Sequence, residues 1–240
     1  TPGVVYLYDY EIDEESKTVY LLEEEGKCLL DYLGHNLIRI EEVPVIGTGI
    51  LDALCRIRDA GYYHRDLSLK NCYYDQQKIR IGDFNSAARI QEAAGAGQVV
   101  GTEKFMAPES YRQYVHDERS ELYAVGMMLY VILNGGLPAF RPEYGQEEAG
   151  RRRLNGESLP LPQYVLKYPG ELDALVGCVM KACAPDPDDR YQTFEEMRTA
   201  IAVAGYDLFL ADTGIRISGG YGDKEITVLQ TAWQPDGRTL

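Results

Sequence analysis

Residues 64–71 read His64-Arg65-Asp66-Leu67-Ser68-Leu69-Lys70-Asn71, and two further motifs follow them. The first is Asp83-Phe84-Asn85, and the second, over residues 101–109, is Gly-Thr-Glu-Lys-Phe-Met-Ala-Pro-Glu. Each motif alone carries little information, because an aspartate in a loop is usually a solvated turn residue. All three together form a combination too long to arise by chance, so they decide how the chain is interpreted.

Three oxygen-bearing side chains in these motifs come from neighbouring segments. Asp66 offers a carboxylate, Asn71 an amide oxygen and Asp83 a second carboxylate. Two strand-like runs, Cys72–Tyr74 and Lys78–Ile81, lie between them, and their pairing would bring Asp83 beside the loop of Asp66. Oxygen donors of this kind suit a hard divalent cation such as magnesium.

The motifs, in this order and at these distances, resemble the catalytic core of the protein kinase family, of the serine/threonine type. The resemblance implies that Asp66 accepts or orients the proton of the substrate hydroxyl, while Asn71 and Asp83 hold magnesium. It also implies that Thr102 braces the catalytic loop and that ATP and Mg²⁺ are the cofactors. Lys70 is either a contact to the transferred phosphate or a solvated lysine.

The resemblance extends to both sides of the core. Val19–Gly26 is similar to the strand that ends a kinase N-lobe and runs into the hinge. Leu22 would be the gatekeeper, and the run from Glu23 to Glu25 would present backbone groups to adenine. The alternative is an acidic loop that binds no ligand.

Three acidic or basic positions further along also fit the family. Glu109 and Arg190 resemble a buried ion pair that clamps the activation segment to the lower helices. Glu121 stands where the family usually has an aspartate, so it would reach the catalytic loop backbone with a longer arm.

Several departures from the family pattern affect the expected activity. Asn85 stands in place of a glycine and Ser68 in place of a lysine, although asparagine tolerates positive φ comparatively well. The glycine-rich loop and the strand lysine would precede the predicted hairpin, and the chain starts at Thr1, too late to hold them. We therefore expect either a fragment or a degenerate protein, nearly inactive in isolation.

The predicted fold class is α+β, protein-kinase-like, with a mainly helical C-lobe and a short β-hairpin remnant of the N-lobe. Residues 1–25 would form the N-lobe remnant and hinge, residues 26–205 the C-lobe, and residues 206–240 a tail to which we assign no role. The hairpin strands are predicted at Val4–Tyr8 and Thr18–Leu22, with a turn at Asp13–Lys17. Helices are predicted from residue 29 and over residues 43–60, 119–134, 146–154, 171–183 and 193–203.

Composition narrows the choice of partners. The 240 residues are 45% hydrophobic and carry a formal charge of −14, which disfavours nucleic acid and anionic lipid and favours basic peptide segments of protein substrates. Five cysteines without a C-x-x-C pair indicate reduced thiols of a cytoplasmic protein. The longest apolar run, Leu122–Leu133, is too short for a membrane span and predicts a helix buried on all sides.

Three functions are compatible with these observations. The first is ATP-dependent phosphoryl transfer to serine or threonine hydroxyls of proteins. The second is a pseudokinase that acts as a binding or scaffold module, which Asn85 and Ser68 favour and the three intact oxygen ligands oppose. The third, a small-molecule kinase, ranks low because that group lacks the segment at residues 101–109.

The segment from Asp83 to Glu109 contains only two hydroxyl side chains, Ser86 and Thr102, and both lie next to the motifs. A phosphorylation switch needs an acceptor that a basic cluster including Arg65 can bind. We therefore predict constitutive or partner-driven control.

Overall fold

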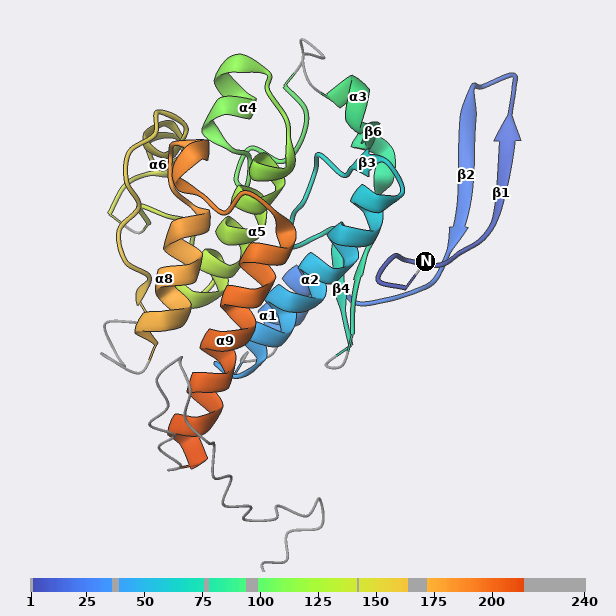
Figure 1. Ribbon diagram of the computed structural model, residues 1–240. Coiled ribbons are helices and arrows are strands. Elements are labelled where there is room, and N and C mark those ends of the chain that lie inside the picture. Colours follow the sequence, from blue (N-terminus) through green and yellow to red (C-terminus); the bar gives the residue numbers. More distant parts are fainter. Residues whose placement is uncertain are drawn as a thin grey trace, which may run out of the picture.

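The long apolar run lies at the centre of the helical region, in helix α5 (Glu118–Leu133) (Figure 1). The computed structural model describes residues 2–35, 39–75, 78–93, 99–141, 143–163 and 172–213. The side chain of Asp117 caps α5 by accepting hydrogen bonds from the backbone N–H groups of Arg119 and Ser120. Every residue from Ser120 to Leu133 is buried, which confirms the predicted helix with no solvent-facing side.

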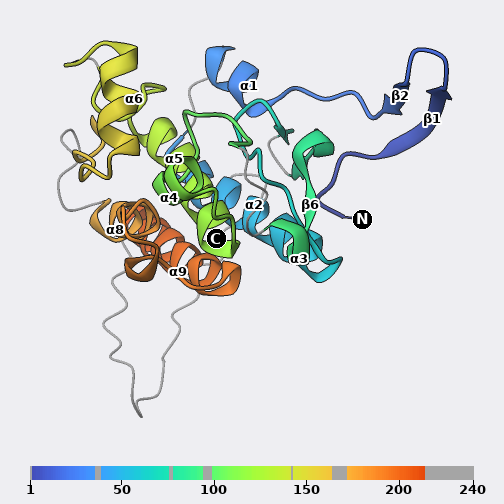
Figure 2. The ribbon, with the colours of Figure 1, turned by 90° about the horizontal axis from the view of Figure 1, so that it is seen from above.

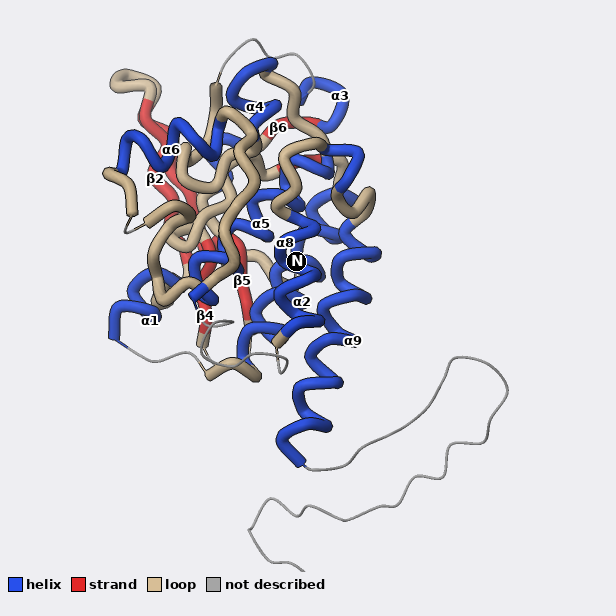
Figure 3. The backbone as a smooth tube through the Cα atoms, turned by 90° about the vertical axis from the view of Figure 1, so that its left-hand side faces the viewer, coloured by secondary structure: helices blue, strands red, loops and turns tan. Residues whose placement is uncertain are grey.

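Three helices pack against α5: α2 (Glu42–Asp59), α8 (Asp173–Ala182) and α9 (Phe194–Thr213). One face of α2 carries apolar residues at helical spacing, and all of them are buried: Ile46, Ile50, Leu54 and Ile57. Figure 3 shows α2 and α9 side by side, and they approach closely. A Cβ on Gly205 of α9 would lie 2.6 Å from the Pro44 Cβ of α2, so this contact requires glycine.

Helix α9 is longer than predicted and continues to Thr213. It therefore runs across the proposed boundary between residues 205 and 206, which stays a prediction. Most of the predicted tail, residues 214–240, lies outside the described residues.

Shorter helices complete the helical region. The predicted helices at residues 29 and 146–154 are confirmed as α1 and α6. The bounds are α1 Leu29–His35, α3 Ile90–Ala93, α4 Pro108–Gln113 and α6 Gln146–Leu154, with 3-10 helices η1 at Phe84–Ser86 and η2 at Pro187–Asp189.

Two small antiparallel strand pairs frame residues 64–71. Strand β3 (Tyr62–Tyr63) pairs with β6 (Ala88–Arg89), and β4 (Cys72–Tyr74) pairs with β5 (Ile79–Ile81). The pairing of β4 with β5, which the sequence predicts, sets Cys72 opposite Ile81 and so brings Asn71 next to Gly82.

A two-stranded hairpin projects away from the helices in both views of Figures 1 and 2. Strands β1 (Leu7–Asp13) and β2 (Thr18–Glu23) are antiparallel, with Tyr10 opposite Leu21. This pair confirms the predicted hairpin.

The predicted first strand at Val4–Tyr8 is wrong in its bounds. Backbone hydrogen bonds draw the segment before it to the edge of β5, where the Val5 N–H donates to Ile81 O (2.9 Å) and the Ile81 N–H donates to Gly3 O (2.9 Å). The strand therefore begins at Leu7 and includes Asp13, which was assigned to the turn.

All five cysteines are free. None of the described helices combines the length and the apolar character that crossing a membrane requires.

Candidate active site

The loop that carries Asp66 is anchored by a buried histidine. His64 is fully buried, its Nε2 lies 3.0 Å from Gly82 O, and its Nδ1 accepts a hydrogen bond from the Asp66 N–H (3.3 Å). Both contacts are satisfied if the neutral ring carries its proton on Nε2 and donates it to Gly82. The Phe84 ring packs edge-on against His64, with centroids 4.9 Å apart. His64 therefore ties the loop to the Asp83 segment.

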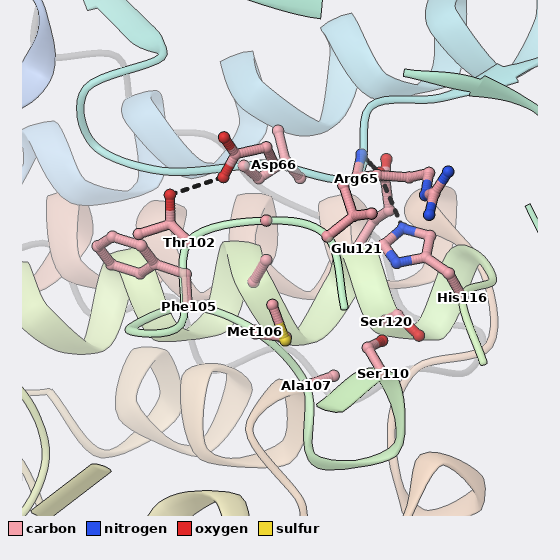
Figure 4. A pocket seen from close by; sticks show the side chains of 14 residues that line it. Arg65, Asp66, Thr102, Phe105, Met106, Ala107, Ser110, His116, Ser120 and Glu121 are labelled. Atoms are coloured by element: carbon pink, nitrogen blue, oxygen red, sulfur yellow. Dashed lines mark hydrogen bonds and ion pairs between the residues drawn. The ribbon is translucent and has the colours of Figure 1, made fainter. Parts of the chain in front are cut away.

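The carboxylate of Asp66 is held by a residue 36 positions later in the chain. Thr102 Oγ1 donates a hydrogen bond to Asp66 Oδ1 at 2.6 Å, and Figure 4 shows the two side chains pointing toward each other. Gly101 allows this approach: its φ is +113°, and a Cβ there would lie 2.6 Å from Arg65 O. The other carboxylate oxygen, Asp66 Oδ2, is free to accept a hydrogen bond, since no hydrogen bond to that atom occurs among the described residues.

Asn71 closes the loop and lies next to the Asp83 segment. Its Nδ2 donates to Asp66 O (2.8 Å), and its backbone oxygen accepts from the Gly82 N–H (2.9 Å). The β4–β5 pairing produces this second bond, because it sets the ends of the two strands side by side. The amide oxygen of Asn71 has no hydrogen-bond partner in the described part of the chain, so it is available as a ligand.

Asp83 projects from a constrained backbone. Its φ of 60° and ψ of 71° are left-handed, immediately before η1, and its side chain is exposed. Such a conformation is uncommon for an aspartate and is found disproportionately at functional sites. The predicted carboxylate is thus exposed to solvent, and its residue follows Gly82, whose N–H bonds to Asn71 O.

The segment directly after the predicted hinge residues runs beside β4, where the Tyr74 N–H donates to Lys27 O (3.1 Å). Burial, followed by the negative charges of Glu23 and Asp83 among others, raises the pKa of the Tyr73 hydroxyl. Gly26, next to the predicted hinge residues, packs against Tyr73 of β4, because a Cβ there would lie 3.1 Å from Tyr73 Cδ1. Leu22 is 61% exposed and Glu25 is also exposed, so the described residues leave these positions open to a ligand.

Glu121 supports the loop from below with the longer arm expected from the sequence. Its Oε1 accepts the Arg65 N–H at 2.7 Å and lies 3.3 Å from His116 Nε2 (Figure 4). Arg65 has a φ of 69°, so Glu121 holds a strained residue directly before Asp66. A cavity of about 20 Å³ lies beside these groups, room for no more than a water molecule.

Glu109 and Arg190 form the predicted buried ion pair. The guanidinium donates to both carboxylate oxygens at 2.7 and 2.8 Å, and Ser120 Oγ donates to Glu109 Oε1 at 3.0 Å. Arg190 also donates to the backbone oxygens of Ala184 and Pro185. This network fixes the end of the segment that begins at Asp83.

The structure shows the surroundings of Asn85 and Ser68, which depart from the family pattern, and of Lys70. Asn85 lies inside η1, and its φ is not positive. The position therefore does not require glycine, and the expectation that asparagine stands there because it tolerates positive φ is wrong. Ser68 is buried, and its backbone oxygen accepts the Asn71 N–H (3.1 Å). Lys70 is exposed and makes no hydrogen bond or ion pair within the described residues, which leaves both of its predicted roles open.

Sequence reasoning missed His64 and His116 as supporting residues. A signal was available for His64, since it stands two residues before Asp66 in the deciding motif. No pattern pointed to His116, because its contact with Glu121 depends on how the segment before α5 folds back on the loop.

Comparison with known proteins identifies the family of the chain. The family described as "Protein kinase domain" matches residues 1–197. The chain is similar to the serine/threonine-protein kinase Pkn1 of Myxococcus xanthus (29% identity over 213 residues, 84% of this chain and 29% of the relative). It is also similar to PrkC of Bacillus subtilis strain 168 (27% over 209 residues, 85% of this chain and 31% of the relative). The chain thus spans about a third of the length of these relatives.

Proposed function

The chain belongs to the protein kinase family, of the serine/threonine type, and from this premise we propose that it supplies the catalytic lobe for ATP-dependent phosphoryl transfer to protein hydroxyls. The observation that carries the proposal is the Asp66 carboxylate, fixed at 2.6 Å from Thr102 in a loop whose Asn71 is hydrogen-bonded to the residue before Asp83. These contacts support a base at Asp66 and metal ligands at Asn71 and Asp83.

Each predicted site residue has one task in the proposed reaction. Asp66 accepts or orients the proton of the serine or threonine hydroxyl, and Thr102 keeps its carboxylate aimed. Lys70, exposed near the loop, contacts the transferred phosphate. The backbone of Glu23 and Glu25 faces adenine, with Leu22 at the back of the base.

Magnesium would be held by Asn71 and Asp83. Magnesium sites in enzymes commonly use one or two protein oxygens and complete the coordination with substrate phosphates and water. One amide oxygen and one carboxylate fit that pattern, and both lack a competing hydrogen bond among the described residues. Bound magnesium would offset the phosphate charge, while the protein supplies position and orientation.

The domain division follows the same proposal. Residues 1–25 act as the N-lobe remnant and hinge, residues 26–205 as the C-lobe and residues 206–240 as a tail. The charge of −14 favours basic segments of protein substrates and disfavours nucleic acid. Since the chain spans a minor part of its relatives, activity and substrates are assigned to the full-length protein.

A binding module without transfer is the second candidate. The exposed hinge residues and the unpaired Lys70 are compatible with a nucleotide or protein ligand that is held but not turned over. The two functions share the fold and differ in whether Asp66 matters for chemistry.

The test compares phosphate transfer from ATP to a basic protein substrate by the full-length wild type and by Asp66→Asn. Loss of a general base commonly lowers the rate by about 10²–10⁴-fold, and we expect a loss in this range with ATP affinity retained. Asp173→Asn, an exposed carboxylate at the start of α8, is the matched control and should leave the rate unchanged. Equal rates for wild type and Asp66→Asn would reject the catalytic assignment, and ATP binding without transfer by the wild type would favour the binding module.

A further inference from the structure

Arg153 is a buried cation that pairs with no acidic residue in the described part of the chain. It lies in the last turn of α6 and is 4% exposed. Its neighbours are different: Arg151 and Arg152 both pair with Glu148 on the outer face of the helix. No carboxylate pairs with Arg153 among the described residues. A buried charge is strongly unfavourable unless other groups compensate for it.

The compensating groups are two backbone carbonyls of the segment before Pro108. Arg153 Nη1 donates to Met106 O, and Nη2 donates to Glu103 O. The two nitrogens of one guanidinium thus bind the two ends of a single turn. A planar guanidinium presents such diverging donors in fixed geometry, whereas a lysine ammonium cannot.

Tyr123 of α5 links this contact to the Glu109 clamp. Arg153 Nη1 lies 3.4 Å from the Tyr123 hydroxyl. The Arg153 and Arg190 guanidinium carbons lie 5.9 and 4.7 Å from the centroid of the same ring. Arg190 fixes the end of the segment through Glu109, and Arg153 binds the turn three to six residues before it, so this part of the segment is held at two separate points.

The turn held by Arg153 begins at the residue that holds Asp66. The N–H groups of Phe105 and Met106 both donate to Thr102 O, at 2.9 and 3.2 Å. Any change in how Glu103 and Met106 are oriented therefore moves Thr102, whose hydroxyl lies 2.6 Å from the Asp66 carboxylate.

We propose that Arg153 is a positioning residue that sets the Thr102–Asp66 contact and the shape of the segment 102–106, and thereby couples helix α6 to catalysis. The catalytic part of this proposal rests on the proposed function. The positioning part rests on the contacts alone. Arg153 touches neither substrate nor cofactor, and it acts through the backbone of the turn.

The experiment compares Arg153→Lys with Arg151→Met in the full-length protein. Arg153→Lys keeps the positive charge but loses the two diverging donor groups of the guanidinium. Arg151 is the matched control because it is on the same helix turn and faces outward. The first measurement is hydrogen–deuterium exchange of the amides at residues 102–107. We expect faster exchange of the Phe105 and Met106 amides in Arg153→Lys, while the exchange rates of the amides in α5 and α9 stay unchanged.

The second measurement separates positioning from folding. In Arg153→Lys the rate constant kcat for the protein substrate should fall by about 10²-fold, as expected when a catalytic group is misplaced by a remote change, while ATP affinity stays at the wild-type value. Exchange and kcat equal to those of Arg151→Met would overturn the proposal. So would faster exchange throughout the helical region together with lost ATP binding, since that result describes a purely structural residue.

Failure of the proposed function gives a different result. If the wild type binds no ATP and transfers no phosphate, but Arg153→Lys still loosens residues 102–107 alone, the positioning role stands and the kinase assignment does not. If the wild type transfers phosphate and Arg153→Lys changes neither readout, the kinase assignment stands and the role of Arg153 does not.

Discussion

Helix α5 and the β1–β2 hairpin both contain runs of apolar side chains, but these are buried in the helix and exposed in the hairpin. In α5 the apolar residues from Leu122 to Leu133 are all buried. In β2, Val19, Tyr20, Leu21 and Leu22 are between 52% and 61% exposed, and Tyr8, Tyr10 and Ile12 of β1 are similarly exposed. Four consecutive apolar residues in a strand are typical of a strand covered on both faces.

The difference shows that a strong local pattern can form an element without supplying its stability. The hairpin has its ladder and its turn, where Asp13 accepts hydrogen bonds from Glu15 and Ser16. Two strands with no covered face are marginally stable in water, however. We infer that the free energy of unfolding of the 240-residue chain resides in the helical region, and that the candidate site depends on it.

Breaking the buried clamp in the helical region should have the largest effect. Arg190→Met leaves Glu109 charged and buried without its partner, which commonly destabilises a protein by about 3–5 kcal/mol. Urea unfolding followed by circular dichroism measures the loss. The double variant Glu109→Leu with Arg190→Met should recover part of it, because no unpaired charge remains. A loss below about 1 kcal/mol for the single variant would contradict the clamp.

A matched pair of leucines tests the contrast directly. Leu54 of α2 is fully buried and Leu21 of β2 is 52% exposed. Leu54→Ala should lower the free energy of unfolding by about 2–5 kcal/mol through lost burial and a residual cavity. Leu21→Ala should change it by less than about 0.5 kcal/mol, as exposed positions usually do. Similar losses for both variants of the 240-residue chain would mean that the hairpin faces are covered in solution.

The elements with the clearest patterns were predictable from the sequence. The buried α5 follows from its long apolar run, and the helices α2 and α6 were predicted close to their observed bounds. The first strand was misplaced because Gly3 and Val5 bond to Ile81, a partner far along the chain that no local pattern announces. The end of α9 was set too early, since Gly205 looks like a helix stop but serves the close contact with Pro44.

The residues of the candidate site also fall into those that the sequence predicts and those that it does not. Asp66, Asn71, Asp83 and Thr102 were predictable because their motifs are contiguous and their chemistry demands particular side chains. Arg153 was not singled out, although it stands four residues after the buried Ala149 and therefore on the inner face of α6. Its partners are backbone oxygens, which every residue has, so the sequence carries no mark of the contact.

A smaller effect than that of the buried clamp or of Leu54 is expected inside the helical region, at an exposed ion pair. Arg58 donates two hydrogen bonds to Glu195, and these lower the pKa of the Glu195 carboxyl from 4.5 to about 2. Because the folded-state pKa is depressed, the stabilisation is present above pH 4.5 and disappears as the pH falls toward 2. The Glu195 side chain is 51% exposed, so solvent screening limits the contribution to about 1 kcal/mol or less.

Glu195→Gln should therefore be slightly less stable than the wild type at pH 7, and the difference in free energy of unfolding should shrink between pH 4.5 and 2. Urea titrations of both proteins at several pH values measure it, with Glu14→Gln in the hairpin turn as the control that should match the wild type throughout. A difference that grows as the pH falls would contradict the sign of the linkage. A difference of several kcal/mol at pH 7 would show that an exposed residue of the helical region can stabilise the protein as much as a buried one. Burial would then not explain the contrast between the helical region and the hairpin.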